Sequence, residues 1–568
     1  MASMARQDRR RTALVLCLLT ALALSGPGCS ARHLAADTVD GTAVLMINHE
    51  HEQPERLLAV RLGSGRLVRV LSDAEQQAAV STGMRVRLTG SWEATPGAAE
   101  SALFRANSIQ AFPGGAAARA AGGAAAHRTR VTTAGIAGVA GDGIVVTSNV
   151  PVAAISTLFI PVAALDAASA GACPGAEEPP LTADQLRAVV FEQEAVREVD
   201  GSKAGLGPAP PSVGSLFSQC SYGKSRLTPA DSMVAETVEL PCNGSSYGIP
   251  WSFDSCDFDD YNGWADAADE RLRAAGVDPD AYQHRVYLLP PGACTFMGVA
   301  YLGCEGSGGG PCRSWVAAGN WDKPQAIAHG LAHNMFLAHA GRILDDGTFD
   351  AFADSSCTMA RFQDATQRCF NTPHAWQLGW ISAQLLDGAS LAPGQTVSAS
   401  LLSQASSDRT GLRILPSWAP GTAPVFVGYR TAQGGDAGLA PLWDGKVSVH
   451  SAAIDSALST SPTVLRAALA VGEAYTFNEA GLVVRFVDSG ADTSAHVSVC
   501  RVAGPETLAS CRAGMDADCN GLAADQDPAC RKLFRKFVFM VPTAGGKKRP
   551  TRPPLVRRRA GARRQGAP

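Results

Sequence analysis

Residues 324–339 read Pro-Gln-Ala-Ile-Ala-His-Gly-Leu-Ala-His-Asn-Met-Phe-Leu-Ala-His. Proline is tolerated in the first turn of a helix, so we expect a helix that opens at Pro324. His329 and His333 are four residues apart, which places both imidazoles on one face of that helix. Two imidazole nitrogens about 2 Å from one ion are a common way for a helix to hold zinc.

A third histidine, His339, follows six residues after His333. On a continued helix it would point about 240° away from His333, so the helix must end between them for all three to meet. The chain has 11 histidines in 568 residues, and three at this spacing favour a metal site over a helix with incidental histidines. The pattern therefore predicts His329, His333 and His339 as zinc ligands.

Several segments around these histidines carry a resemblance to known proteins. They are Cys220-Ser-Tyr-Gly-Lys, Val238-Glu-Leu-Pro-Cys242, Ala326-Ile-Ala-His329, His333-Asn, Leu337-Ala-His-Ala340, Asp354-Ser-Ser-Cys-Thr-Met359, Cys369-Phe-Asn and Trp376-Gln-Leu-Gly-Trp380. Together they resemble the gametolysin family of algal matrix metallopeptidases, and the histidine spacing resembles the metzincin signature His-Glu-x-x-His-x-x-Gly-x-x-His. The resemblance runs through about residues 215–385 and more faintly to 450. It implies a zinc peptidase that cleaves extracellular-matrix or cell-wall glycoproteins.

The resemblance also implies a role for Met359, which follows the third histidine by about 20 residues. Metzincins place a Met-turn at this distance, and its methionine forms the apolar floor beneath the metal. A plain core methionine is the alternative, because Met fills cores readily.

Two positions depart from the family pattern. The general base that deprotonates zinc-bound water and then protonates the leaving amine should be Glu, but the chain has Gly330. Losing such a base typically costs about 10²–10⁴ in rate, so a catalytically inactive pseudopeptidase that binds matrix proteins is the alternative to an active enzyme. The second departure is Phe336, where the family has the Gly of a left-handed turn. A bulky residue there costs roughly 1–2 kcal/mol, or the turn takes another form.

Other carboxylates could replace the missing base, and the sequence favours none of them. The candidates are Glu305, Asp322, Asp345 and Asp346.

The N-terminus has the pattern of a secretory signal. Four arginines between Arg6 and Arg11 precede the 12-residue apolar run from Ala13 to Leu24, which is too short to cross a bilayer as a helix. We expect residues 1–30 to be a signal peptide and the mature chain to be secreted, without a membrane segment. An uncleaved anchor is the alternative.

The cysteines agree with secretion. Of the 15 in the chain, eight lie between Cys220 and Cys369 and four between Cys500 and Cys530, which predicts about four and two disulfides. Cys173 is left over, and it could pair with Cys29, stay unpaired or cap the zinc of a latent enzyme. In a secreted chain Asn243-Gly-Ser is an N-glycosylation acceptor.

The pattern of strands and helices predicts an α+β multidomain protein, with a metzincin-like metallopeptidase domain flanked by β-rich domains. The expected boundaries are an N-terminal β-domain that is a possible propeptide (40–112), an Ala/Gly linker (113–127), the metallopeptidase domain (128–385), a C-terminal β-domain (386–502), a Cys-rich acidic loop (503–530) and a basic disordered tail (531–568).

The acidic loop has the oxygen-ligand spacing of a calcium site. Asp516, Asp518, Asn520 and Asp527 fall at positions 1, 3, 5 and 12 of an EF-hand-like loop, with Gly521 at position 6. The cysteines in and around the loop differ from an EF-hand, so a disulfide-held acidic turn is the alternative.

The formal net charge of −3 conceals an uneven distribution. Residues 531–568 carry 13 Lys and Arg and no acid, residues 1–29 have a net charge of +3, and the body between them is left with −19. We expect the tail to be a solvated charge run that could bind acidic matrix polysaccharide. Nucleic acid is not an expected partner of a secreted chain.

Overall fold

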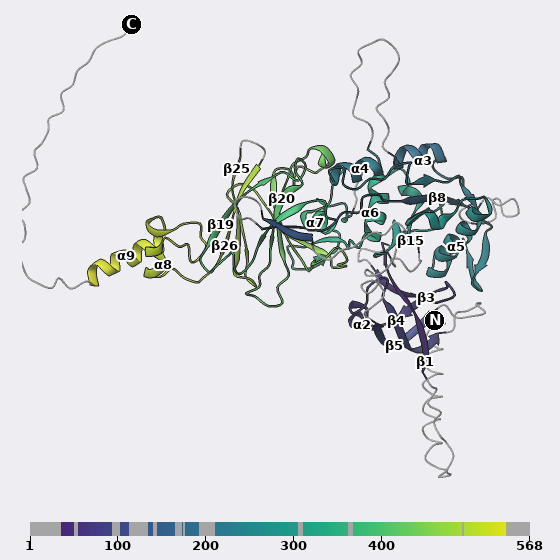
Figure 1. Cartoon of the computed structure of the whole chain (residues 1–568), viewed down its shortest axis with the longest axis horizontal. Coiled ribbons are helices and arrows are strands. Elements are labelled where there is room, and N and C mark those ends of the chain that lie inside the picture. The colour runs from purple at the N-terminus through teal and green to yellow at the C-terminus, as the bar shows by residue number, and fades with distance from the viewer. Residues whose placement is uncertain are drawn as a thin grey trace, which may run out of the picture.

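The computed structural model describes residues 36–49, 55–93, 103–112, 135–139, 145–164, 173, 176–191, 211–304, 311–361, 367–490 and 494–540. Both helices and strands are present, as expected for the α+β class. Figure 1 shows an elongated molecule, with a purple N-terminal β-domain beside a teal region of helices and sheet, then green sheets and yellow helices at the far end. The expected signal peptide and linker lie outside the described residues.

The N-terminal β-domain is a closed five-stranded barrel. Its elements are β1 (Asp37–Asn48), β2 (Glu55–Arg61), β3 (Leu67–Leu71), α2 (Ala74–Ala78), β4 (Arg85–Glu93) and β5 (Leu103–Phe112). The strands pair in the order β1-β2-β3-β5-β4 and β4 closes back on β1, with β3 and β5 parallel. This is the strand order of an OB-fold, whose closure protects the strand edges.

The central region is a sheet with helices on both faces. Its strands are β8 (Thr157–Ala163), β9 (Met233–Val234), β10 (Val238–Glu239), β13 (His284–Leu288), β14 (Gly298–Tyr301) and β15 (Cys312–Val316). Its helices are α3 (Ala183–Val190), α4 (Val213–Cys220), α5 (Phe258–Ala274) and α6 (Pro324–Asn334), and a hairpin is formed by β11 (Asn243–Ser246) and β12 (Ile249–Ser252). The sheet order is β10-β8-β13-β15-β14, parallel except for β14.

Alternation along the central strands explains the two helical layers. In β13, Val286 and Leu288 belong to the core formed with α3, α4 and α6, whereas Tyr287 belongs to the core formed with α5. Successive side chains of a strand point to opposite faces, so a fully buried strand must be covered on both sides. The helix with the histidine motif therefore lies on one face of this sheet.

The C-terminal β-domain packs two sheets around one core. Its elements are β6 (Gly135–Val139), β7 (Val145–Ser148), β16 (Ala340–Ile343), β17 (Phe349–Asp350), α7 (Thr372–Gln377), β18 (Ser382–Leu386), β19 (Thr396–Leu402), β20 (Arg409–Ile414), β21 (Val425–Arg430), β22 (Lys446–Ala452), β23 (Thr463–Leu469), β24 (Ala474–Phe477), β25 (Leu482–Ser489) and β26 (Ser494–Arg501). Nine strands form one sheet and β19-β26-β25-β24 form the other, and both contribute to one hydrophobic cluster. This is a sandwich arrangement.

The sheets cross the expected boundary at residue 385. Strands β6 and β7 extend the nine-stranded sheet through β18, and β16, which begins directly after His339, pairs with β23. The expected metallopeptidase and C-terminal domains therefore share a sheet. Short 3₁₀ helices connect the larger elements at η2 (Pro279–Ala281), η3 (Ala318–Asn320), η4 (Gly434–Asp436) and η5 (Ala524–Gln526).

Six disulfides are present among the described residues. They join Cys173 to Cys242, Cys220 to Cys369, Cys256 to Cys294, Cys304 to Cys312, Cys500 to Cys519 and Cys511 to Cys530. The expectation that Cys173 is the odd cysteine was wrong, because it pairs with Cys242 and is not available to cap a metal. Among the described cysteines, Cys357 is the free thiol instead. It is fully buried, and burial raises its pKa to about 12.

The C-terminal segment ends in two helices, α8 (Leu508–Ala513) and α9 (Pro528–Met540). The expected disordered tail from residue 531 was wrong over its first ten residues, because α9 continues to Met540. The reason is that Leu533 and Phe534 interrupt the basic run and are partly buried. Residues 541–568 lie outside the described residues. Among the described helices, none has the length and apolar character needed to span a membrane.

Candidate metal centre

Helix α6 carries His329 and His333. It ends before His339, as the convergence of the three histidines requires. Pro324 occupies its first turn, and the helix stops at Asn334. The amide of Leu337 donates to the carbonyl of Ala332 and the amide of Phe336 donates to that of His333, which is the bonding pattern of a Schellman motif. Phe336 stands at its left-handed position with φ 69°. The turn therefore keeps the form that a glycine would favour, at a cost of roughly 1–2 kcal/mol.

This turn brings the third histidine back to the first two. The Nε2 atoms of His333 and His339 are 3.1 Å apart. A fourth histidine, His49 from the end of β1, places its Nε2 atom 2.8 Å from that of His339 and 3.1 Å from that of His333. One ligand nitrogen from each of these three residues and from His329 lies within 4.8 Å of the others.

At two of these residues, hydrogen bonds determine which ring nitrogen keeps a lone pair for a metal. Nδ1 of His329 lies 2.9 Å from the carbonyl of Thr358, and Nδ1 of His333 lies 2.6 Å from the carbonyl of Leu337. A carbonyl oxygen only accepts, so Nδ1 carries the hydrogen and Nε2 keeps its lone pair. Backbone partners of this kind orient metal-binding histidines.

The electrostatic setting keeps the four imidazoles neutral. Burial lowers the pKa of His329 to about 4. Burial, reinforced by the neighbouring imidazoles, holds the pKa values of His49, His333 and His339 well below their usual range. Neutral imidazole is the form that binds metal.

The arrangement fits zinc. Zinc binds imidazole nitrogen at about 2.0–2.1 Å in tetrahedral geometry, which separates the nitrogens by about 3.3 Å. The observed separations of 2.8–3.1 Å are close to that value. Converging lone pairs repel one another unless a cation or a hydrogen lies between them, so the four histidines form a set of donors suited to one ion.

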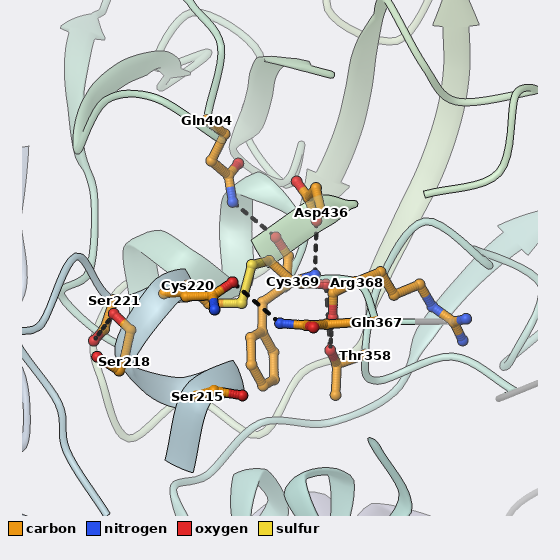
Figure 2. Close-up of a disulfide and its surroundings, with 12 residues drawn as sticks. Ser215, Ser218, Cys220, Ser221, Thr358, Gln367, Arg368, Cys369, Gln404 and Asp436 are labelled. Carbon is orange, nitrogen blue, oxygen red and sulfur yellow. Dashed lines mark hydrogen bonds between the residues drawn. A yellow bond between two sulfur atoms is a disulfide. The ribbon is translucent and has the colours of Figure 1, made fainter. Parts of the chain in front are cut away.

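Figure 2 shows the disulfide between Cys220 and Cys369 and the hydrogen bonds around it that involve Thr358. Thr358, whose carbonyl accepts from His329, donates its hydroxyl to the carbonyl of Arg368 at 2.6 Å. The next residue, Cys369, is joined to Cys220 of α4, and its amide donates to Asp436 at 2.7 Å. The C-terminal β-domain therefore helps to hold the carbonyl that orients His329.

A family model described as Gametolysin peptidase M11 matches residues 172–471, just over half of the chain. The chain belongs to the gametolysin peptidase family. The chain is also 24% identical to "Autolysin" of Chlamydomonas reinhardtii over 423 residues, which cover 56% of this chain and 63% of that protein. The match thus spans less than two thirds of the autolysin.

Gly330 stands at the position where the resemblance predicts a general base. A Cβ atom built at Gly330 would lie 3.3 Å from the Cβ of Ser314 on β15, so a larger residue requires Ser314 to move by a few tenths of an ångström. The group of possible metal ligands that contains His329 holds only histidines among the described residues. Asp322, Asp345 and Asp346 are exposed, and Glu305 lies outside the described residues.

Met359 lies in the core beside α6. It is fully buried in the hydrophobic cluster that contains Ile327, Leu331 and Leu337. Its carbonyl accepts from the amide of Ala340, the residue after His339. The turn that contains Met359 therefore contacts the chain next to two of the histidines, while its role as a floor beneath the metal stays a prediction.

Sequence reasoning missed His49. The residue follows β1 directly in the segment Asn48-His49-Glu-His51, and the pair of histidines at the end of a strand was the available signal. Its distance of 280 residues from His329 hid the connection. The pairing of β1 with β14 brings it to the site.

The acidic loop is tied together internally. Asp516 accepts from the amides of Asn520 and Gly521, and Asp527 accepts from the side chain of Asn520 and from the amides of Ala529 and Cys530 at the start of α9. Two disulfides enclose the loop.

The loop brings together a different set of acids from the one expected. The carboxylates that converge are Glu506, Asp516 and Asp518, without Asp527. Calcium binding by Asp516, Asp518, Asn520 and Asp527 stays a prediction. Asn243, the predicted glycosylation acceptor, is exposed on β11.

Proposed function

We propose that this gametolysin-family chain is a secreted zinc metallopeptidase homologue that acts on peptide bonds of extracellular-matrix or cell-wall glycoproteins. The observation that carries the proposal is the convergence of His329, His333 and His339 at the end of α6. Family membership and the likeness to an autolysin support the peptidase-type reaction. Six disulfides support an extracellular location.

In this proposal His329, His333 and His339 hold the ion, and the carbonyls of Thr358 and Leu337 orient two of the rings. Bound zinc lowers the pKa of a water molecule and polarises a carbonyl. The usual Glu would take the proton from the attacking water, and Gly330 cannot. We therefore expect hydrolysis slower by about 10²–10⁴ than with a base in place.

A second candidate is a pseudopeptidase that keeps the metal and binds matrix proteins without cleaving them. Gly330 is the observation that favours it, together with the exposed positions of Asp322, Asp345 and Asp346. A carboxylate that points into solvent cannot take the place of a base that must reach a water molecule inside the site.

Zinc content and cleavage of a matrix glycoprotein by four purified proteins separate the two candidates. They are the parent, His333→Ala, Gly330→Glu and Gly330→Gln. Gln has nearly the same shape as Glu but cannot act as a base. Cleavage by the parent that is lost in His333→Ala supports the peptidase. Cleavage that appears only in Gly330→Glu, and not in Gly330→Gln, supports the pseudopeptidase. Absence of zinc from the parent overturns the metal site in both candidates.

We further propose that residues 541–568 attach the protein to acidic matrix polysaccharide. This segment carries nine Lys and Arg and no acid, and such attraction is screened by salt. Deleting residues 541–568 leaves α9 complete and should abolish retention on an anionic polysaccharide column. Unchanged retention contradicts the proposal.

A further inference from the structure

Strand β1 leaves the N-terminal barrel and joins the central sheet. Its last residues pair antiparallel with β14, with Ile47 opposite Ala300 and Asn48 opposite Val299. The amide of His49 then donates to the carbonyl of Gly298 at 3.1 Å. The register of this ladder fixes where the backbone of His49 lies.

The same ladder directs the His49 imidazole to the other histidines. Its Nε2 atom lies 2.8 Å from Nε2 of His339 and 3.1 Å from Nε2 of His333. The ring of Phe352 lies beside both His339 and His49. Its centroid is 4.4 Å from that of His339 and 6.0 Å from that of His49. The Phe352 ring is therefore an apolar neighbour of these two imidazoles.

We infer that His49 is the fourth protein ligand of the metal, so that the N-terminal β-domain closes the site of its own chain. The inference rests on the proposed metal site but not on hydrolysis. Catalytic zinc sites have three protein ligands and leave a fourth position for water or substrate, whereas sites with four protein ligands are closed. Here a fourth imidazole stands where that water would bind.

The strand that delivers His49 also covers the edge of the sheet beside the site. Without β1, β14 would be the edge strand of the central sheet, and an extended peptide can add to such an edge through backbone hydrogen bonds. The amide of Gly303, just after β14, donates to the carbonyl of His333 at 2.8 Å, so this edge lies beside the histidines. Strand β1 thus occupies the edge of β14, to which an extended peptide could otherwise bind.

The closing strand is firmly attached. Val44 and Met46 belong to the same hydrophobic cluster as Tyr287 and Trp315 of the central sheet. The buried hydroxyl of Thr82 donates to the carbonyl of Leu302 at 2.6 Å and accepts from the amide of Leu45 at 3.0 Å. Displacing β1 would expose this shared core to water, so the described arrangement favours closure as the resting state.

Cobalt substitution tests the inference without any assay of hydrolysis. The purified full chain is stripped of metal, loaded with Co(II), and titrated with azide while the visible absorption of the metal is recorded. The same titration is made on His49→Ala and on His496→Ala, a control that removes an exposed histidine of β26. Thermal unfolding of the metal-free proteins checks that each variant is folded.

The inference predicts that azide changes the spectrum of His49→Ala with an apparent Kd at least about tenfold lower than that of the wild type or His496→Ala. An equal azide response in the wild type and His49→Ala overturns the fourth ligand and leaves the three-histidine site intact. Failure of the folded wild-type protein to bind Co(II) overturns the proposed metal site, and the fourth ligand with it. If His49→Ala unfolds, X-ray absorption at the cobalt edge of the wild type decides, because three imidazoles with an oxygen ligand overturn the inference.

Discussion

Two buried histidine clusters in this protein show opposite uses of the same side chain. In one, His450 donates to a carboxylate oxygen of Asp354 at 3.0 Å, and both residues are fully buried. In the other, the ring nitrogens of His49, His333 and His339 face one another at 2.8–3.1 Å, and the group holds no carboxylate among the described residues. Apart from the partly buried His49, the histidines of both clusters are buried, and the clusters differ in which groups their ring nitrogens contact.

The difference indicates which cluster is structural. Asp354 accepts from Ser356 with one oxygen and from Asn371 and His450 with the other, so its charge is met by donors of the protein itself. Buried polar groups are stable when they are paired in this way. In the second cluster one ring nitrogen from each histidine lies within 4.8 Å of the others, which is an arrangement suited to a metal.

The largest expected effect comes from removing a converging imidazole. His333→Ala should lower zinc affinity by more than about 100-fold, because even the partners of metal ligands contribute 10–100-fold. Chelation should lower the melting temperature of the wild type and leave that of His333→Ala unchanged, since a bound ligand stabilises the folded state. Metal analysis with calorimetry measures both effects. An equal response to the chelator in the two proteins contradicts the metal assignment.

Asp354→Asn should lower stability and leave zinc binding unchanged. The substitution replaces one carboxylate oxygen by an NH₂ group, which cannot accept the hydrogen bonds that the carboxylate oxygen accepts. We therefore expect a loss of about 3 kcal/mol in the free energy of unfolding. Zinc stoichiometry should remain that of the wild type. Urea denaturation and metal analysis measure these quantities, and loss of zinc with unchanged stability would reverse the roles of the two clusters.

The buried carboxylate of Asp354 should make the stability of the wild type depend on pH in acid. Burial alone would raise the pKa of Asp354, but hydrogen bonds from His450, Asn371 and Ser356 outweigh it and hold the pKa below its usual range. The ionised carboxylate therefore stabilises the fold above its unfolded-state pKa of about 3.9, and this contribution is lost as pH falls below that value. Metal-free wild type should lose stability below about pH 4 more steeply than metal-free Asp354→Asn. Parallel pH profiles would contradict this.

The smallest effect concerns the turn between two of the converging histidines. Because Phe336 has φ 69°, Gly should be better tolerated there than Ala. Phe336→Gly should be more stable than Phe336→Ala by about 1 kcal/mol, although both lose the packing of the ring against Gly303. Thermal unfolding measures the difference, and greater stability of Phe336→Ala would show that the left-handed turn is absent.

The sequence predicted the local structure around the histidine motif. The spacing of His329, His333 and His339 required the helix to end between the last two, and α6 ends at Asn334. Four-residue periodicity and the geometry of a turn act over a few residues, so they can be read from the chain itself. The α+β class followed in the same way from strand and helix patterns.

The parts that sequence could not predict depend on distant contacts. His49 reaches the site through the pairing of β1 with β14, and Cys173 finds Cys242 across 69 residues. Neither pairing has a local signature, and even counts of cysteine within a block wrongly left Cys173 alone. The shared sheet between the central and C-terminal regions was missed for the same reason, since β16 pairs with β23 far along the chain.

X-ray absorption at the zinc edge of the purified protein tests the account most directly. A site formed by His49, His329, His333 and His339 predicts four imidazole nitrogens at about 2.0–2.1 Å and no oxygen ligand. Three imidazoles should remain in His49→Ala, with an oxygen ligand in place of the fourth. Three imidazoles with an oxygen ligand in the wild type, or wild-type protein that holds no zinc, would contradict ligation by four histidines.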